Sequence, residues 1–275
     1  MTTPLRLTLF QTDIAWEEKQ TNLSRLHALL ETLSGQTDLV VLPETFTTGF
    51  TMQPEPFAEP GNGSFATTMR QWSVQYGIAL AGSYIASAPL TNDAGKIACF
   101  NRAFFFTPEG GEHYADKRHL FRMGGEDRHY TPGHQREIIY YRGWNIRLLV
   151  CYDLRFPVWS RNVGNAYDLL IYVANWPASR RRVWDVLLQA RAIENQSYTC
   201  GVNRIGIDGH GFDYNGGSAL YSPKGDCVAA IADNKEDFIT IALDHASLAL
   251  FREKFPVWKD ADRFTLEGSS QQEQR

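Results

Sequence analysis

Residues 148–157 read Leu148-Leu149-Val150-Cys151-Tyr152-Asp153-Leu154-Arg155-Phe156-Pro157, an apolar run that stops at a cysteine and enters a turn. The run predicts a buried strand, and the turn after it predicts a nucleophile elbow with Cys151 at the strand end. We expect an exposed thiol with backbone N–H groups directed toward it, which would lower the thiol pKa and provide a place for an oxyanion. The alternative is a buried core cysteine, which is what we expect of Cys99, Cys200 and Cys227.

Strand-like and helical segments alternate on both sides of this stretch. Helical spacing of apolar residues covers 17–33, 64–76 and 183–195. Strand-like runs lie at 5–11, 38–42, 78–85, 99–106, 146–150, 169–173, 198–203, 218–221, 228–231 and 238–243. This alternation predicts a layered α/β domain. The hairpin-like runs of the second half predict mixed rather than purely parallel sheets.

The composition is that of one globular protein. Of the 275 residues, 43% are hydrophobic and 21% are charged, values that are ordinary for a soluble domain. No linker, repeat or low-complexity tract interrupts the chain before residue 264, so we expect a single domain at 1–264. Residues 265–275 are polar, and we expect them to be frayed.

Charge and hydropathy indicate the partners to expect. The net charge of −4 does not favour nucleic acid or an anionic membrane as a partner. No apolar run approaches the roughly 20 residues that span a bilayer, and the first residues lack the apolar region of a signal peptide. We therefore expect a cytoplasmic protein with free thiols.

Two further segments place a reactive side chain after a strand-like run. Glu44 follows Val40-Val41-Leu42-Pro43, where partial removal from water would suit a general base; the alternative is a turn or helix cap. Lys117 lies between an aromatic strand and an apolar segment, and as a buried cation it would need carboxylate partners. The alternative there is a surface lysine. Taken alone, each segment favours its structural alternative.

Taken together, the three segments resemble the nitrilase, or carbon–nitrogen hydrolase, superfamily, from Leu5 to about Phe264. That family carries a Glu-Lys-Cys triad in the contexts apolar-Pro-Glu, Lys-x-His-Leu and Cys-x-Asp-x-Arg-x-Pro. The chain has Leu42-Pro43-Glu44, Lys117-Arg118-His119-Leu120 and the run at 151–157 in the same order. Glu126, seven residues ahead of Gly133, matches a second glutamate that often accompanies the triad. The resemblance implies a four-layer α-β-β-α sandwich, with no organic cofactor and no metal.

Within the superfamily, the runs CYDLRFPVWSRN at 151–162 and ANWPASR at 174–180 resemble the omega-amidases most. These enzymes remove ammonia from the terminal amide of 2-oxoglutaramate and 2-oxosuccinamate. The resemblance implies that Cys151 forms a thioester and that Glu44 transfers protons. Lys117, between Glu44 and Glu126, would stabilise the oxyanion together with the backbone N–H of Tyr152.

A substrate of this class carries a carboxylate, so its pocket needs a cation near the nucleophile. Arg155 lies four residues past Cys151, but it has an alternative role in which it pairs with a carboxylate and holds the elbow. Arg180, Arg181 and Arg182 follow Trp176, which would form an apolar wall. We expect this arginine cluster to bind the substrate; the alternative is a solvated helix start.

The partners expected are therefore a small carboxylate-bearing amide and further copies of the chain, which would form a homodimer or larger homo-oligomer through the aromatic-rich segment 156–159. Other functions remain as alternatives. An N-carbamoyl amino acid hydrolase or a true nitrilase of the same family would differ in its pocket residues. A non-catalytic binding protein on this fold predicts a broken triad, yet all three residues are present. A zinc hydrolase needs clustered ligands, whereas the seven histidines are scattered and the four cysteines match no zinc spacing.

Overall fold

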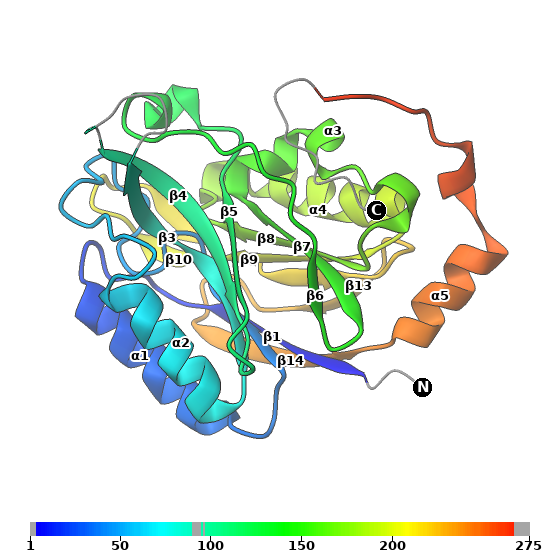
Figure 1. Cartoon of the computed structure of the whole chain (residues 1–275), viewed down its shortest axis with the longest axis horizontal. Coiled ribbons are helices and arrows are strands. Elements are labelled where there is room, and N and C mark those ends of the chain that lie inside the picture. Colours follow the sequence, from blue (N-terminus) through cyan, green and yellow to red (C-terminus); the bar gives the residue numbers. More distant parts are fainter. Residues whose placement is uncertain (1–3, 90–94, 96, 267–275) are drawn as a thin grey trace.

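The computed structural model describes residues 4–89, 95 and 97–266. Its centre is a pair of six-stranded sheets, which Figure 1 shows packed against each other. The first sheet has the strand order β14 (Asp237–Leu243), β1 (Leu5–Gln11), β2 (Leu39–Val41), β3 (Ala79–Pro89), β4 (Ile97–Phe106) and β5 (Glu112–Asp116). The second has the order β13 (Cys227–Ala230), β12 (Ala219–Tyr221), β9 (Tyr198–Asn203), β8 (Leu169–Ala174), β7 (Trp144–Val150) and β6 (Ile139–Tyr141).

Both sheets are mixed, as the sequence predicts. In the first sheet, β2 pairs in parallel with β1 and β3, and the outer pairs are antiparallel. In the second, β8 pairs in parallel with β7 and β9. The carboxyl ends of parallel strands meet at one edge of a sheet, which is where sites collect in such folds. Glu44 follows β2, and Cys151 follows β7 directly.

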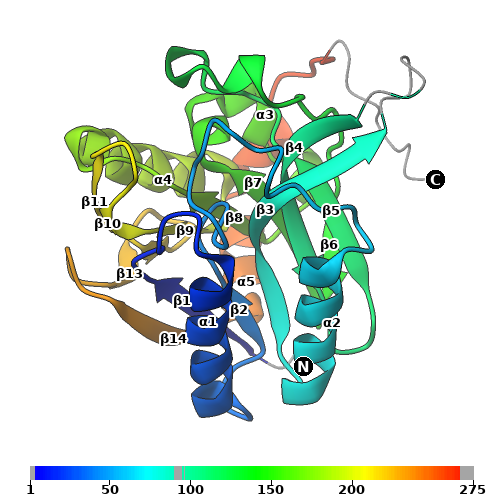
Figure 2. The same ribbon diagram turned by 90° about the vertical axis from the view of Figure 1, so that its left-hand side faces the viewer.

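Helices cover the outer face of each sheet, which completes the predicted α-β-β-α layers (Figure 2). On the first sheet, α1 (Lys19–Leu33) and α2 (Ser64–Tyr76) bury residues such as Leu26 and Met69 against the strands. On the second, α4 (Arg181–Asn195) packs so close to β9 that a Cβ at Gly201 would lie 2.4 Å from Leu188 and 2.5 Å from Trp184. Glycine is therefore required at that contact.

One core cluster joins the inner faces of the two sheets. It contains Leu7 and Phe105 from the first sheet with Ile146 and Leu148 from the second. The two sheets therefore share one core, and the domain bounds of 1–264 stay a prediction. Of the predicted tail, residues 267–275 lie outside the described part of the chain.

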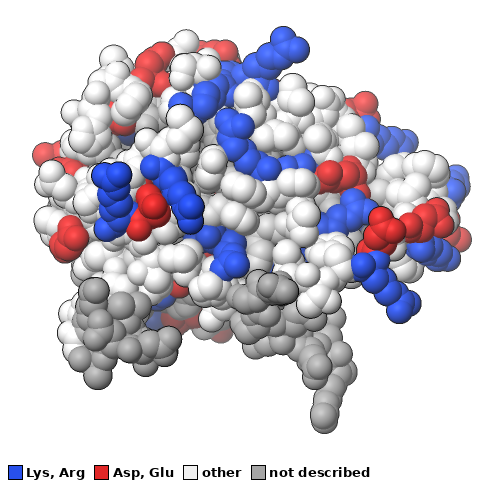
Figure 3. All heavy atoms as spheres, turned by 90° about the horizontal axis from the view of Figure 1, so that it is seen from above, with Lys and Arg blue, Asp and Glu red and all other residues white. Residues whose placement is uncertain are grey.

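The sequence did not predict every element. The described residues form six strands and α-helices that were not predicted. They are the strands β5 and β6, the hairpin of β10 (Ile205–Ile207) and β11 (Asp213–Asn215), and the helices α3 (Pro157–Ser160) and α5 (His245–Lys254). Within the described residues, no helix is both long and apolar enough to cross a bilayer. On the face in Figure 3, basic and acidic side chains are interspersed, in keeping with the small net charge.

Candidate active site

Cys151 stands in a strained turn at the end of β7. Its backbone φ of +45° lies in the left-handed region, which is rare for a residue other than glycine and collects at functional sites. The chain continues into the 3₁₀ helix η3 (Cys151–Arg155). Asp153 holds this turn, because its carboxylate accepts the Val150 backbone N–H at 3.2 Å and both the backbone N–H and Nδ1 of His119. The predicted elbow is present.

The environment of the thiol differs from our expectation. Only 9% of Cys151 is exposed, so the thiol does not stand open at the top of the sheet. Burial raises the thiol pKa well above its ordinary value, and the nearby Glu44 carboxylate adds to this; the Lys117 ammonium opposes it. The prediction of a lowered thiol pKa is therefore wrong, because loss of hydration outweighs the favourable charge. A thiol in this state needs a base to become nucleophilic.

Three charged side chains lie together beside the thiol. Lys117 Nζ is 2.9 Å from Glu44 Oε1 and 2.9 Å from Glu126 Oε1, and all three residues are buried. Burial lowers the pKa of the Lys117 ammonium, but the carboxylates of Glu126 and Glu44 outweigh that effect and raise it well above its ordinary value. The lysine therefore stays protonated at neutral pH.

Two asparagines complete this network. The Asn175 backbone N–H donates to Glu44 Oε2 at 2.7 Å, and its side-chain Nδ2 donates to the Glu44 carbonyl at 2.7 Å. Asn101 on β4 donates through Nδ2 to Glu44 Oε1 at 2.7 Å. Asn175 belongs to the run 174–180 that resembles the omega-amidases. Asn101 was not predicted, because a single asparagine within an aromatic strand gives no sequence signal of its own.

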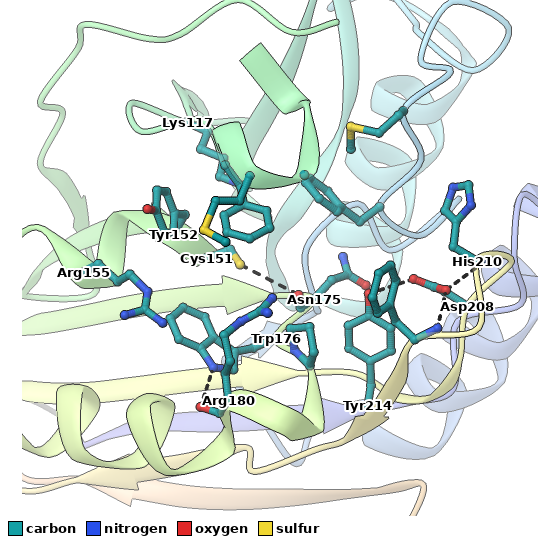
Figure 4. A pocket seen from close by; sticks show the side chains of 17 residues that line it. Lys117, Cys151, Tyr152, Arg155, Asn175, Trp176, Arg180, Asp208, His210 and Tyr214 are labelled. Atoms are coloured by element: carbon teal, nitrogen blue, oxygen red, sulfur yellow. Dashed lines mark hydrogen bonds between the residues drawn. The ribbon is translucent and has the colours of Figure 1, made fainter. Parts of the chain in front are cut away.

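A cavity of about 250 Å³ opens onto Cys151 and Lys117. Figure 4 shows Arg155 and Arg180 on the side of the cavity near Cys151, with Asp208, His210 and Tyr214 at its other end. The remaining wall is mostly apolar and comprises Phe50, Met52, Phe121, Met123, Gly124, Tyr152, Asn175, Trp176, Pro177 and Phe212. Sequence reasoning missed the contribution from β10 and β11, because that hairpin carries no recognisable motif.

The structure separates the three clustered arginines. Arg180 lines the cavity with its guanidinium carbon 5.2 Å from the Phe121 ring centre. Arg181 points elsewhere and pairs with Asp185 and Asp233, each at 2.8 Å. Arg182 is exposed and does not line the cavity. Only the first member of the cluster can therefore reach a molecule in this cavity.

Arg155 also lines the cavity, where its guanidinium carbon lies 5.2 Å from the Trp176 ring and 6.0 Å from the Tyr152 ring. Among the described residues, neither Arg155 nor Arg180 has a carboxylate within ion-pair distance, whereas Arg181 has two. The alternative role of Arg155 as the ion-paired holder of the elbow is thus not what the structure shows; Asp153 holds the elbow instead.

The other cysteines divide into two kinds. Cys99 and Cys200 are buried, as predicted, but Cys227 on β13 is exposed, so its assignment to the core is wrong. β13 is the edge strand of the second sheet, and this sulfur faces solvent. Within the described residues, no group of three or more His, Cys, Asp or Glu side chains is placed to hold a metal ion.

Comparison with known proteins agrees with this geometry. The family model described as carbon-nitrogen hydrolase matches residues 6–253. The chain is 44% identical to omega-amidase YafV of Escherichia coli over 95% of this chain and 98% of that protein. It is 27% identical to 2-oxoglutaramate amidase of Bacillus subtilis, covering 92% and 96% of the two chains.

A solved structure is similarly close. The crystal structure of XC1258 from Xanthomonas campestris, a CN-hydrolase superfamily protein with an arsenic adduct in its active site, superimposes with a TM-score of 0.89. The two sequences are 39% identical, and the match covers 96% of this chain and 99% of that one. The family model covers most of the chain, and its matched residues include every member of the buried charge network, so the chain belongs to the carbon–nitrogen hydrolase family.

Proposed function

We propose that the protein is an omega-amidase that hydrolyses the terminal amide of a short 2-oxo acid, such as 2-oxoglutaramate or 2-oxosuccinamate, and releases ammonia. The observation that carries this proposal is the cavity itself, which joins a buried thiol and its charge network to two arginines that lack an acidic partner among the described residues. A substrate with an amide at one end and a carboxylate at the other matches both features.

The curated relatives support the same assignment. Two relatives that align over nearly the whole chain are omega-amidase YafV and 2-oxoglutaramate amidase. Family membership alone establishes hydrolysis of a carbon–nitrogen bond, and the arginines supply the reason to favour an anionic amide over a neutral one.

In the proposed acylation step, Cys151 Sγ attacks the amide carbon. Glu44 takes the thiol proton and then gives it to the leaving nitrogen, so the C–N bond breaks, ammonia departs and a thioester remains. Glu44 next takes a proton from water, whose oxygen attacks the thioester. The C–S bond then breaks, the carboxylic acid product forms, and the proton returns to Cys151.

Lys117 is proposed to stabilise the negative oxygen of both tetrahedral intermediates, with the backbone N–H of Tyr152 as a second donor. The buried position strengthens this interaction because little water competes for the charge. Glu126 keeps the lysine protonated without touching the substrate. At the other end of the substrate, Arg155 and Arg180 would bind the carboxylate, with Trp176 as the apolar wall between them.

We further propose that the protein works in the cytoplasm as a homodimer or larger assembly. Segment 156–159 supports this, because Phe156, Val158 and Trp159 line a surface groove and Val158 is 49% exposed. Pro157 and Val158 are exposed beside the half-buried Phe156, whereas Trp159 is buried. Adjoining apolar surface of this kind is typical of a contact between chains.

The test is ammonia release across a panel of 2-oxoglutaramate, 2-oxosuccinamate, glutamine, N-carbamoyl amino acids and simple nitriles. We expect kcat/KM to be highest for the two 2-oxo acid amides, by at least about tenfold. Faster turnover of the N-carbamoyl amino acids would instead identify the protein as the carbamoyl hydrolase of the alternative, and faster turnover of the nitriles as a true nitrilase.

A further inference from the structure

Asn101 occupies an unusual position in the buried charge network. Its Nδ2 lies 2.7 Å from Glu44 Oε1 and 3.4 Å from Glu126 Oε1, so one amide group faces both carboxylates. The same two oxygens share Lys117 Nζ. An amide NH₂ has two hydrogens, which is the number needed to donate once to each carboxylate.

The backbone of Asn101 contributes as well. Its carbonyl accepts the Lys117 backbone N–H at 2.9 Å, and the β4–β5 register pairs the neighbouring Arg102 with Asp116. This register fixes where the lysine leaves β5. Because the backbone contact is independent of the side chain, substitution at 101 changes the donors to the carboxylates while leaving the lysine anchored.

The side chain is not explained by stability alone. Asn101 is fully buried, and its Oδ1 has no hydrogen-bond partner within the described residues. Turning the amide over would direct Oδ1 at two carboxylates, so the orientation is determined by the network. A buried polar atom without a partner is costly, and an apolar side chain of similar size would avoid that cost. A polar group kept at such a cost calls for a functional reason.

That reason lies in the behaviour of two close, buried carboxylates. Without donors between them they share a proton, because like charges in a medium of low polarity cannot both remain ionised. Burial already raises the pKa of Glu126, with the Glu44 charge contributing and Lys117 opposing. Glu44 can act as a base only in its ionised form. Among the described residues, the Oε1 atoms of Glu44 and Glu126 accept hydrogen bonds from Lys117 and Asn101, so without the amide they would share the Lys117 ammonium alone. Their Oε2 atoms would keep the backbone N–H groups of Asn175 and Phe121.

We propose that Asn101 is a positioning residue that donates to Glu44 and Glu126 together, and so holds the Glu44 carboxylate aligned to take the proton of Cys151. This inference rests on the proposed roles of Glu44 and Cys151, and it holds whichever amide is the substrate. The titratable groups that interact electrostatically with these carboxylates are Lys117, Cys151, Tyr130 and, for Glu44, Tyr214, and no variant in the test replaces any of them.

The variant Asn101→Leu removes both N–H donors at similar size, and Asn101→Ala is made in parallel in case the first does not fold. Two readouts are recorded against pH: kcat/KM for ammonia release, and the rate at which iodoacetamide alkylates Cys151 in the absence of substrate. We expect the acid limb of both profiles to move upward by at least about one pH unit, because losing a donor to an ionised carboxylate raises its pKa. KM should stay within about threefold.

The matched control is Asn162→Leu. Asn162 is also buried and hydrogen-bonded, but its partners are Tyr167 and Asn195, outside the cavity. We expect it to lower the melting temperature without moving either pH profile. If folded Asn101 variants keep the wild-type acid limb in the alkylation profile, the proposal is overturned. Because alkylation needs no amide, this result is independent of whether the proposed substrate is correct.

Discussion

Glu126 holds Lys117 and the cavity wall with one carboxylate: Oε1 lies 2.9 Å from Lys117 Nζ, and Oε2 accepts the Phe121 backbone N–H at 2.5 Å. The Phe121 ring in turn lies under the guanidinium of Arg180. Glu126 thus connects Lys117, the proposed oxyanion donor, to the Phe121 ring against which the proposed carboxylate-binding Arg180 lies. Its position suits a residue that organises the site without contacting the substrate.

Glu126→Gln should lower kcat by at least about 10²-fold, the usual cost of weakening an oxyanion donor. The substitution should also change how kcat depends on pH on the basic side of its profile. The Glu126 charge raises the pKa of Lys117, so its removal lowers that pKa and the ammonium is lost as pH rises. We expect the wild type to keep its activity to high pH and the variant to lose activity at lower pH. A kcat–pH series measures both effects.

The control for that series is Glu137→Gln, which removes a half-buried carboxylate paired with His113 outside the cavity. It should leave the profile unchanged. A Glu126→Gln enzyme with reduced kcat but an unchanged basic limb would show that the glutamate acts through the Phe121 loop alone and not through the lysine charge.

The cysteines give a second prediction. Cys151→Ala should abolish turnover, whereas Cys227→Ala should keep activity within about threefold because that side chain is exposed on an edge strand. Iodoacetamide should label both residues, but only labelling of Cys151 should follow the loss of activity. Peptide mapping during inactivation measures this, and inactivation that follows Cys200 or Cys99 instead would remove Cys151 as the nucleophile.

Much of the fold could be predicted because its signals are local. The helix at 64–76 and the strand at 198–203 have the bounds that the sequence indicates, since apolar periodicity and glycine at the helix end specify them. The missed strands pair with their neighbours along the chain, but they are short and their own sequences carry little apolar signal. β5 and β11 contain mostly polar or half-buried residues, and α5 buries only Leu248, so none shows a clear apolar pattern.

The site was predictable to a different extent. Glu44, Lys117 and Cys151 come from three motifs whose order in the chain is informative, which is why they could be named together. The thiol pKa could not be predicted, because its direction depends on how completely the surrounding segments bury the sulfur. The different surroundings of Arg180, Arg181 and Arg182 could not be predicted either, because adjacent residues at the start of α4 point in different directions.

Association through segment 156–159 leads to a third prediction. Val158→Asp should convert the proposed homodimer to monomers, because an unpaired charge is expensive to bury in an apolar contact. Light scattering at micromolar concentration measures the mass. Val74→Asp is the control, since Val74 is similarly exposed but lies on α2, away from this segment. A wild-type protein that is already monomeric under these conditions contradicts the proposed assembly.

The last prediction concerns how the cavity recognises charge. Arg155 and Arg180 line it, and neither has an acidic partner within the described residues, so their guanidinium groups are available to a substrate carboxylate. Arg155→Ala and Arg180→Ala should each raise KM for 2-oxoglutaramate by at least about tenfold, which corresponds to roughly 1.4 kcal/mol. A neutral amide of similar length should show little change, because it never used that charge. Arg182→Ala is the matched control: it removes the same charge two positions along the chain, from an exposed site outside the cavity. If the control raises KM as much as Arg180→Ala does, the effect comes from the general positive field at the entrance. If neither cavity variant changes KM for the anionic substrate, the carboxylate is bound at the opposite end of the cavity, beside His210 and Tyr214.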